Sequence, residues 1–425
     1  MTVATAAAPT AATAAAPAPA VGTVPYDELA ARFRPLFAEI AAGASARERD
    51  HVLPAEQIRA LAAAGFGAVR VPIENGGAGA TLPQLFRLLT ELASADSNIP
   101  QALRGHFALV EDRLVATDGT RERWLQRFVD GEIGGNAWTE VGTVAIGDVN
   151  TKVSPIEGDP ERFLVNGTKY YSTGSIFADW IDVFAQRSDT GATVIAIVDA
   201  RQGGVTHADD WDGFGQRTTG SGTSTFVDAV VAAEDVVDFG TRFRYQTAFY
   251  QAVLLSVLAG SIAAAERELA EAVRGRTRIY SHGNADSYAA DPQILQVVGQ
   301  VSAAAYAGSA IVEKAAQALQ LAYEAASGED LVEEERLNDL AELESAQAQI
   351  VLTQLATRAT SDVFDALGAS GVSTTKNLDR HWRNARTAAS HNPWVFKARI
   401  VGDHAVTGAL PPRVWSIGAG PGRRA

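Results

Sequence analysis

The chain of 425 residues contains no cysteine. Disulfides, thiolate metal sites and a cysteine nucleophile are therefore excluded, although this absence does not fix the redox compartment. The seven histidines are scattered, and no pair has metal-ligand spacing with a third donor nearby, so we expect no metal. A nucleophile elbow and a dinucleotide fingerprint in the right context are also missing. The glycine-rich segment 73–79 lacks the Gly-Lys-Ser/Thr ending of a phosphate loop.

Positive charge is scarce as well, with 36 Lys and Arg against 50 Asp and Glu and a net charge of -14. This balance argues against nucleic acid as the main partner, because phosphate binding needs a basic surface. No apolar run approaches the roughly 18 residues of a membrane span, so we expect no membrane association. Residues 1–22 lack the charged start of a signal peptide. We predict disordered tails at 1–22 and 418–425 and a cytoplasmic location.

Helical patterns dominate both ends of the chain. The segment 54–65 opens with Pro54 and closes with Gly65, which is typical of a helix. A second helix is predicted from Pro83, with leucines 85, 88, 89 and 92 on one face. Long alanine-rich helices return from about residue 247 to 367, interrupted by a loop at 282–292. The acidic stretch 329–344 is most simply a solvated helix face with its connecting loop.

The middle of the chain has a different texture. Short β-prone runs at 162–165, 182–185, 193–198 and 225–227 are punctuated by Gly, Asp and Asn, as in an antiparallel barrel or sandwich. We therefore predict an α+β protein with an N-terminal helical domain (23–133), a middle β-barrel or sandwich domain (134–243) and a C-terminal helical bundle (244–417).

Four polar segments could carry chemistry. They are Gly135-Asn-Ala-Trp-Thr-Glu-Val-Gly142, Asn166-Gly-Thr-Lys-Tyr-Tyr-Ser-Thr-Gly174, the run 209–222 (DDWDGFGQRTTGSG), and Asn377-Leu-Asp-Arg-His-Trp-Arg-Asn-Ala-Arg386 followed by His391-Asn-Pro393. Each alone fits an ordinary turn, and a single Trp such as Trp138 or Trp211 is more often a core residue than a ligand platform.

Their joint order, within a helix–β–helix chain, resembles the acyl-CoA dehydrogenase superfamily. The resemblance is nearest to the branch that contains SfnB-type sulfur-acquisition oxidoreductases and dibenzothiophene monooxygenase, and it extends from about Phe33 to Trp415. It implies the acyl-CoA dehydrogenase fold with a C-terminal four-helix bundle, a flavin cofactor and a homotetramer.

The chemistry of this superfamily divides on a carboxylate base. A dehydrogenase needs one to remove the α-proton of an acyl thioester. Here no Asp or Glu lies between Asp379 and Asp403, where the commonest members carry it, and His391 takes its place. The stretch 247–265, where other members carry the base, has no carboxylate either. The resemblance therefore favours a monooxygenase that forms a C4a-(hydro)peroxyflavin, which needs hydrogen-bond donors and exclusion of water.

The resemblance also assigns roles to residues. It implies that Asn136, Thr173 and His391 surround the reactive flavin centre and that His106 lies on the substrate side. A pKa near neutrality would let His391 donate to the peroxide or shuttle its proton. Trp138, Thr139 and Ser172, with Thr173, would line the flavin ring, and Arg278, Arg383 and Arg386 would bind its phosphate.

Two positions depart from the family pattern Arg-Thr-His-x-x-His-Asp-Pro. This chain has Ala388 in place of the first histidine and Asn392 in place of the aspartate. Asn392 cannot supply the negative charge that would raise the pKa of His391. If the missing first histidine helps bind flavin phosphate or tune the second histidine, the resemblance predicts a flavin affinity or substrate choice different from that of the relatives.

The expected function is oxygenation of a small organic, organosulfur substrate by O2, with reduced FMN from a separate NAD(P)H-dependent reductase. FAD is the alternative cofactor. The alternative functions are an FAD-dependent acyl-CoA dehydrogenase or oxidase, a hydroxylase of nitrogen or aromatic carbon in a biosynthetic pathway, and a helical assembly protein that has lost flavin.

Overall fold

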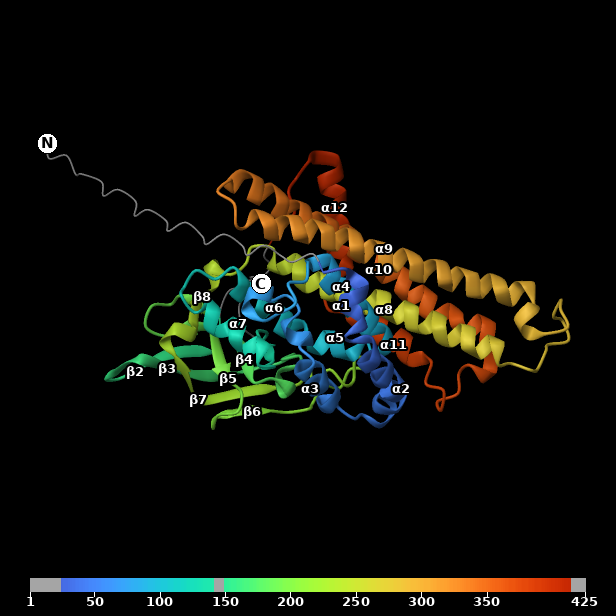
Figure 1. The fold of residues 1–425 in the computed structure, drawn as a ribbon, viewed down its shortest axis with the longest axis horizontal. Helices are drawn as coiled ribbons and strands as arrows, with labels where there is room; N and C mark the ends of the chain where they lie inside the picture. The colour runs from blue at the N-terminus through green and yellow to red at the C-terminus, as the bar shows by residue number, and fades with distance from the viewer. Residues whose placement is uncertain (1–23, 141–148, 414–425) are drawn as a thin grey trace, which may run out of the picture.

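The computed structural model describes residues 24–140 and 149–413. The predicted tails at 1–22 and 418–425 lie outside the described residues, as do the last two residues of the segment 135–142. In Figure 1 the strands from the middle of the chain lie at the lower left, and helices from both ends of the chain lie above them and to their right, which confirms the predicted α+β order.

The N-terminal layer is helical. Its elements are α1 (Tyr26–Ala31), α2 (Arg34–Asp50), α3 (Ala55–Ala63), η1 (Phe66–Ala68), η2 (Ile73–Asn75), α4 (Leu82–Ala95), α5 (Asn98–Ala102), α6 (Arg104–Leu114) and α7 (Arg121–Val129). Pro54 is the N-cap of α3, and Gly65 follows the helix with a φ of 82°, as its punctuation predicts. Helix α4 begins with a capping box between Thr81 and Gln84.

The middle of the chain forms one eight-stranded sheet. The strands are β1 (Gly134–Ala137), β2 (Lys152–Ile156), β3 (Asp159–Lys169), β4 (Trp180–Arg187), β5 (Thr193–Asp199), β6 (Val205–His207), β7 (Ser224–Ala232) and β8 (Val236–Asp238). Their order is β6-β7-β3-β2-β4-β5-β8, and β1 pairs with β4. All four predicted β runs lie in strands. Most neighbouring strands pair antiparallel as expected, but β1 and β2 both run parallel to β4, so the sheet is mixed.

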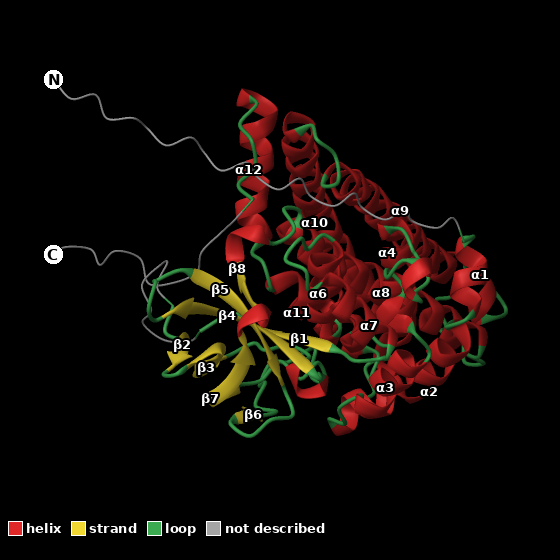
Figure 2. Ribbon diagram, turned by 60° about the vertical axis from the view of Figure 1, so that its left-hand side comes forward, coloured by secondary structure: helices red, strands yellow, loops and turns green. Residues whose placement is uncertain are grey.

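The C-terminal half is a bundle of three long helices with shorter ones at its ends. The elements are α8 (Gln246–Arg274), α9 (Pro292–Ala325), α10 (Leu331–Leu367), α11 (Asp379–Ser390) and α12 (Trp394–Thr407). Helix α11 packs against α8 and α10, and α12 extends away from the bundle (Figures 1 and 2).

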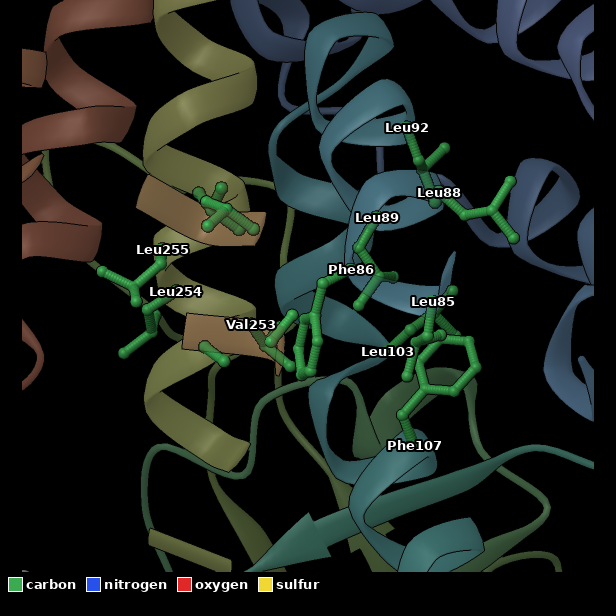
Figure 3. Packing of buried hydrophobic residues seen from close by; sticks show 14 of the residues in the cluster. Leu85, Phe86, Leu88, Leu89, Leu92, Leu103, Phe107, Val253, Leu254 and Leu255 are labelled. Carbon is green, nitrogen blue, oxygen red and sulfur yellow. The ribbon is translucent and has the colours of Figure 1, made fainter. Parts of the chain in front are cut away.

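The two helical regions share one core where α4 packs against α8. Leu85, Leu88, Leu89 and Leu92 of α4 are all buried, as the sequence predicts. Figure 3 shows Phe86 facing Val253 of α8, and the rings of Phe86 and Phe249 are 5.3 Å apart. Truncating a buried Phe to Ala typically costs ~3–5 kcal/mol, so this seam holds the N-terminal layer on the bundle.

Two helices are longer and more apolar than the sequence reading allowed. By length and composition alone, α8 and α9 could each cross a membrane. The apolar window of α8 is 89% buried, as in the core helix of a folded protein, whereas that of α9 is 17% buried. The expectation that no apolar run approaches membrane length was therefore wrong, because α8 has no charged residue from 246 to 265 and α9 has none from 292 to 312.

The acidic stretch 329–344 is only partly solvated. Glu334 and Glu342 are buried, opposite Arg244 (3.1 Å) and Lys397 (4.0 Å) respectively. Burial raises the pKa of Glu342 to about 7. The expectation of a wholly solvated face was wrong, because this part of α10 packs against α12 and the start of α8.

Candidate functional site

Six segments of chain converge where the N-terminal layer meets the sheet and the bundle. They are the α5–α6 junction, the start of β1, the turn 170–175, the loop 209–222, the first turns of α8 and the end of α11. In Figure 2, β1 reaches from the sheet toward α6. All four polar segments singled out in the sequence border this region.

Backbone packs against backbone at the seam between α6 and the sheet. A Cβ on Gly105 would lie 2.8 Å from Asn136 Oδ1, so only glycine allows this approach. Gly174, which has a φ of 80°, lies against the carbonyl of Ala102. The two glycines fix the turn 170–175 and the start of β1 beside the α5–α6 junction.

Asn136 is buried at this seam. The side-chain oxygen of Asn136 has no hydrogen-bond partner among the described residues. Its backbone carbonyl oxygen accepts a hydrogen bond from Ser175 Oγ at 3.1 Å. A buried amide oxygen without a partner costs free energy. Asn136 is therefore positioned by its neighbours and retains an acceptor to offer a ligand.

Thr173 begins a chain of hydroxyl groups. Its Oγ1 is 2.8 Å from Ser221 Oγ, which is 2.7 Å from Thr219 Oγ1, and Thr219 donates to the carbonyl of Gln216 at 2.9 Å. Because Thr219 commits its proton to a carbonyl, Ser221 donates to Thr219 and Thr173 donates to Ser221. The carbonyl of Tyr171, 3.4 Å from Thr173 Oγ1, is a second and more distant acceptor for the same proton. The chain leaves the lone pairs of Thr173 available to accept from a ligand N–H.

The loop 209–222 is attached to α11. The Gln216 backbone N–H donates to Asn384 Oδ1 at 2.6 Å, and a Cβ on Gly215 would lie 2.6 Å from Thr387 Oγ1. Gln216 has a φ of 54°, which is strained for a residue with a side chain. The strained loop brings Gln216 and Thr218 to the same region as Thr173.

Arg104 and His391 meet at the far side of the cluster. Arg104, at the start of α6, is 6% exposed, and its Nη2 lies 2.9 Å from His391 Nε2. A guanidinium can only donate, so His391 Nε2 accepts and the ring proton resides on Nδ1. Nδ1 then donates to Asn392 Oδ1 at 3.3 Å, and Asn392 Nδ2 donates to Gln251 Oε1 at 2.9 Å.

This arrangement keeps His391 neutral. Loss of hydration around the ring and the charge of Arg104 lower the pKa of His391, although the residue retains solvent exposure that tempers the shift. The predicted donation by His391 to the peroxide, or the shuttling of its proton, stays a prediction. The expected pKa near neutrality is corrected to a lower one. The physical reason is a cation in contact with Nε2 and an uncharged Asn392 on the other side.

His106 is fully buried, and both ring nitrogens bond to backbone. Gly134 N–H donates to Nδ1 at 3.1 Å, and Nε2 donates to the carbonyl of Gly67 at 2.9 Å. Burial lowers the pKa of His106 to about 4. This geometry does not support the predicted catalytic role, because neither nitrogen is free to move a proton. It supports a positioning role that ties η1 to the start of β1.

The three other residues expected to line a flavin ring are engaged by the protein. Trp138 Nε1 donates to Asp182 at 2.8 Å, and its ring packs against Tyr250 at 5.4 Å. Ser172 Oγ donates to the Gly222 carbonyl at 2.7 Å. Thr139 is half-buried and accepts through its carbonyl from Tyr170 N–H. These three residues border the site, and the Trp138 ring is held in place by its hydrogen bond to Asp182 and its packing against Tyr250.

The three arginines expected to bind phosphate are not brought together. Arg383 donates to Glu48, Asn377, Asp379 and the Phe214 carbonyl, so phosphate would have to displace these partners. This supports a positioning role for Arg383 in place of the predicted one.

Arg386 and Arg278 are exposed. Arg386 donates to Ser390 Oγ on the surface of α11. Arg278 lies in the loop after α8, at the end of the bundle far from the sheet (Figure 1). Within one chain, Arg278 cannot reach the cluster that contains Thr173.

Of the sixteen buried side-chain polar atoms without a partner in the described part of the chain, seven lie in the six segments. Among the described residues they include Gln101 Oε1, Arg104 Nε, Asn136 Oδ1, Gln216 Oε1, Thr218 Oγ1, Tyr250 Oη and Thr387 Oγ1. Such atoms are rare in folded proteins unless a ligand or water satisfies them. Acceptors and donors are mixed, which suits a polar aromatic ligand with both kinds of group.

The sequence reading missed Arg104, Gln216, Ser221 and Tyr250. Ser221 and Gln216 lie in a polar segment that was noted only as a whole. Arg104 directly precedes the Gly-His-Phe motif. The sequence does not show that its guanidinium is buried without a carboxylate partner. Tyr250 lies in a run of apolar helix residues and reads as core.

Most carboxylates that border this region are bound by other side chains or lie outside it. Asp182 binds Arg242 at 2.8 Å, and Glu48 binds Arg383 at 2.9 Å. Glu266, the first carboxylate of α8, lines a shallow groove between α4 and α9. Glu268 binds Arg380 and His381, and these contacts hold its pKa at about 2. In the loop 209–222, Asp209 lies 3.0 Å from His51, Asp210 accepts from the Thr223 N–H at 2.7 Å, and Asp212 is exposed. Within residues 24–140 and 149–413, the buried part of the site therefore contains no free carboxylate base.

Comparison with known proteins places the chain among flavin enzymes. The acyl-CoA dehydrogenase N-terminal domain family matches residues 27–132, and the acyl-CoA dehydrogenase C-terminal domain family matches residues 252–395. Together they span most of both helical regions.

Three individual proteins are similar over most of their length. Dibenzothiophene monooxygenase of Rhodococcus qingshengii is 27% identical, with 83% of this chain and 86% of that protein covered. The probable FMNH2-dependent monooxygenase SfnC of Pseudomonas putida is 25% identical over 92% of this chain and 98% of its own length. The FMN-bound crystal structure of TdsC from Paenibacillus sp. A11-2 superposes with a TM-score of 0.82 at 26% identity, covering 90% and 98% of the two chains.

Proposed function

The chain belongs to the acyl-CoA dehydrogenase superfamily, and we propose that it is a reduced-flavin-dependent monooxygenase that oxygenates a small organosulfur compound with O2. The observation that carries this proposal is that the described residues place no buried, free carboxylate at the candidate site. Removal of an α-proton from an acyl thioester needs such a base. Oxygen transfer instead needs placed hydrogen-bonding groups and a site closed to water.

Reduced FMN is the cofactor that this proposal requires, because TdsC is FMN-bound and SfnC is described as FMNH2-dependent. The unpaired atoms of Asn136, Gln216 and Thr218, with the lone pairs of Thr173, fit the mixed donors and acceptors along a flavin ring edge. These residues would hold the ring, against the wall that Trp138 forms. The flavin, when bound, supplies the activation of O2.

The protein's own residues would bind and orient the flavin and exclude water. Asn136, Thr173 and Ser221 are all buried, and the hydroxyl chain fixes which way the proton of Thr173 points. Reduced flavin must come from elsewhere, because the sequence offers no nicotinamide-binding fingerprint. A separate NAD(P)H-dependent flavin reductase is therefore the proposed partner.

Rapid mixing tests the proposal. Protein incubated anaerobically with reduced FMN is mixed with oxygenated buffer, and absorbance is followed. We expect a flavin species distinct from both the reduced and the oxidised form, living at least tenfold longer than in free solution. The proposal is wrong if no such species forms while an acyl-CoA bleaches tightly bound oxidised flavin.

A homotetramer is the proposed assembly. Its support is the open apolar face of α9, where Leu295, Tyr306 and Leu321 are 50%, 80% and 43% exposed, and the exposed Tyr280 at the end of the bundle near Arg278. Apolar surface of this kind marks an interface. In the tetramer, Arg278 of one chain would then be available to the flavin phosphate of another. Sedimentation equilibrium tests the assembly, and a monomer would contradict it.

A cytoplasmic location is proposed on chemical grounds, because reduced flavin from a nicotinamide-dependent reductase is made there. Cell fractionation with an activity assay tests it. Recovery of the protein outside the cytoplasmic fraction would contradict it.

A further inference from the structure

The most unusual charge in the molecule is that of Arg104. Its guanidinium is buried and donates through Nη2 to His391, while its Nε has no partner among the described residues. The other strong neighbour is the Tyr250 ring, 5.3 Å from Cζ. Neither His391 nor Tyr250 carries a negative charge at neutral pH, so nothing in the described part of the chain neutralises Arg104.

A buried cation without a counter-charge is costly, and proteins retain one where a ligand pairs with it. Burial lowers the pKa of Arg104 only to about 10, so the group is still charged at neutral pH. Other buried arginines of this chain have carboxylates: Arg70 binds Glu111 and Arg242 binds Asp182. The exception at Arg104 lies inside the candidate site.

A second donor lies beside it. Tyr250 Oη is buried and unpaired, and burial raises the pKa of the phenol, which keeps it protonated. Arg104 Nε and Tyr250 Oη are thus two donors on neighbouring side chains. His391 cannot compete for an anion, because its Nε2 accepts from Arg104 and its Nδ1 faces Asn392.

We propose that Arg104 and Tyr250 bind the anionic group of the substrate, which is a small organic oxyanion such as a sulfinate or a carboxylate. This deepens the proposed function, on which it rests. It separates this chain from an enzyme for a neutral aromatic heterocycle such as dibenzothiophene, which offers no anion to a guanidinium. Two oxygens on one atom match two donors on neighbouring side chains.

The position of Arg104 favours the substrate over the flavin phosphate as its anion. Gly105, the next residue, packs against Asn136, and Gly174 packs against Ala102, so Arg104 emerges beside the groups that would hold the flavin ring. The phosphate of FMN is a full ribityl chain away from that ring.

Matched pairs of ligands test the proposal. Calorimetric titration of protein saturated with oxidised FMN compares methanesulfinate with dimethyl sulfoxide and benzenesulfinate with methyl phenyl sulfoxide. A charge-assisted hydrogen bond predicts that each sulfinate binds about ten- to a hundredfold more tightly than its sulfoxide. The preference should vanish in Arg104→Gln, shrink in Arg104→Lys and in Tyr250→Phe, and persist in Arg162→Gln, which removes an exposed arginine of the β2–β3 hairpin.

A stability measurement guards against trivial failure. Without ligand, Arg104→Gln should have a denaturation midpoint equal to or above that of the wild type, because it removes an unpaired buried charge. Added methanesulfinate should raise the wild-type midpoint and leave that of Arg104→Gln unchanged. If Arg104→Gln does not fold, Arg104→Lys and the wild-type preference decide.

Three outcomes overturn the proposal. They are equal affinity of wild type for sulfinate and sulfoxide, an unchanged preference in Arg104→Gln, and loss of FMN affinity in Arg104→Gln with the preference intact, which would assign Arg104 to the phosphate. None of these measurements uses oxygen. Failure of the oxygen-mixing experiment would therefore reject the proposed function while leaving the anion site to be judged by the titrations.

Discussion

Two buried arginines of this chain have opposite surroundings. Arg70, in the N-terminal layer, donates to both oxygens of Glu111, and Tyr245 Oη donates to the same carboxylate at 2.8 Å. Arg104, at the candidate site, has a neutral histidine and an unpaired Nε. The first arrangement ties the loop between η1 and η2, which contains Arg70, to α6 and to the start of α8. The second leaves a charge for something else to satisfy, and this difference separates scaffold from site.

Breaking the paired arrangement should have the largest effect. Glu111→Gln leaves Arg70 buried without a counter-charge and weakens the bond from Tyr245. Removing one partner of a buried ion pair typically costs ~3–5 kcal/mol. Urea denaturation followed by tryptophan fluorescence measures the loss. Arg104→Gln should show no loss of stability in the same assay, because it removes an unpaired buried charge, and equal losses in the two variants would erase the distinction between the two arginines.

The histidines extend the comparison to pH. The pKa of His106 is lowered to about 4 from its ordinary 6.5. The unfolded chain therefore binds a proton that the folded chain refuses, so stability is complete above about pH 6.5 and falls as the pH drops toward 4. The group contributes a loss of up to about 3 kcal/mol over this window. Urea denaturation at several pH values should show a shallower slope for His106→Asn, and an identical slope would reject this assignment.

Substitutions of Thr173, in the chain of hydroxyl groups, test the candidate site, and their expected effect is smaller. Thr173→Ala removes the acceptor and leaves Ser221 without its donor, whereas Thr173→Ser keeps both. A hydrogen bond of ordinary strength predicts about a tenfold weaker affinity for reduced FMN in Thr173→Ala and little change in Thr173→Ser. Anaerobic flavin titration measures both. Equal affinities in the two variants would mean that the hydroxyl does not touch the flavin.

The smallest expected effect comes from Asn392→Asp, which supplies a negative charge next to His391. The pKa of His391 should rise by about one unit, as a nearby carboxylate favours the charged ring. NMR titration of the histidine ring checks this, with His404 of α12 as the internal control. No change would mean that Arg104 governs His391 alone.

The sequence predicts the fold well because its signals are local. Pro54 and Gly65 mark a helix by backbone chemistry, and the leucines of α4 mark their buried face by spacing. The parallel pairing of β1 with β4 is not local, and the glycine-rich sequence of β1 gives no signal that predicts it. The burial of Glu342 likewise depends on Lys397, which lies 55 positions away in the chain.

The site was predicted less evenly. Asn136, Thr173 and His391 lie in distinctive segments and do border one region in the structure. The roles of His106 and Arg383 could not be read from sequence, because both depend on which partners consume their nitrogens. Arg104 was missed for the opposite reason. It stands out because no carboxylate pairs with it in the fold, and a missing partner cannot be recognised in the sequence.

The glycines at the seam constrain how such an enzyme can acquire new substrates. Gly105 and Gly174 press backbone against backbone, so any side chain added there would push the sheet and helical layer apart. Positions 105 and 174 therefore do not tolerate a larger residue. Diversification must therefore act on the opposite wall, formed by the end of α11 and the turn after it, and Ala388 and Asn392 are both found there. The route by which the family explores new chemistry would then be set by where backbone leaves no room for a mutation.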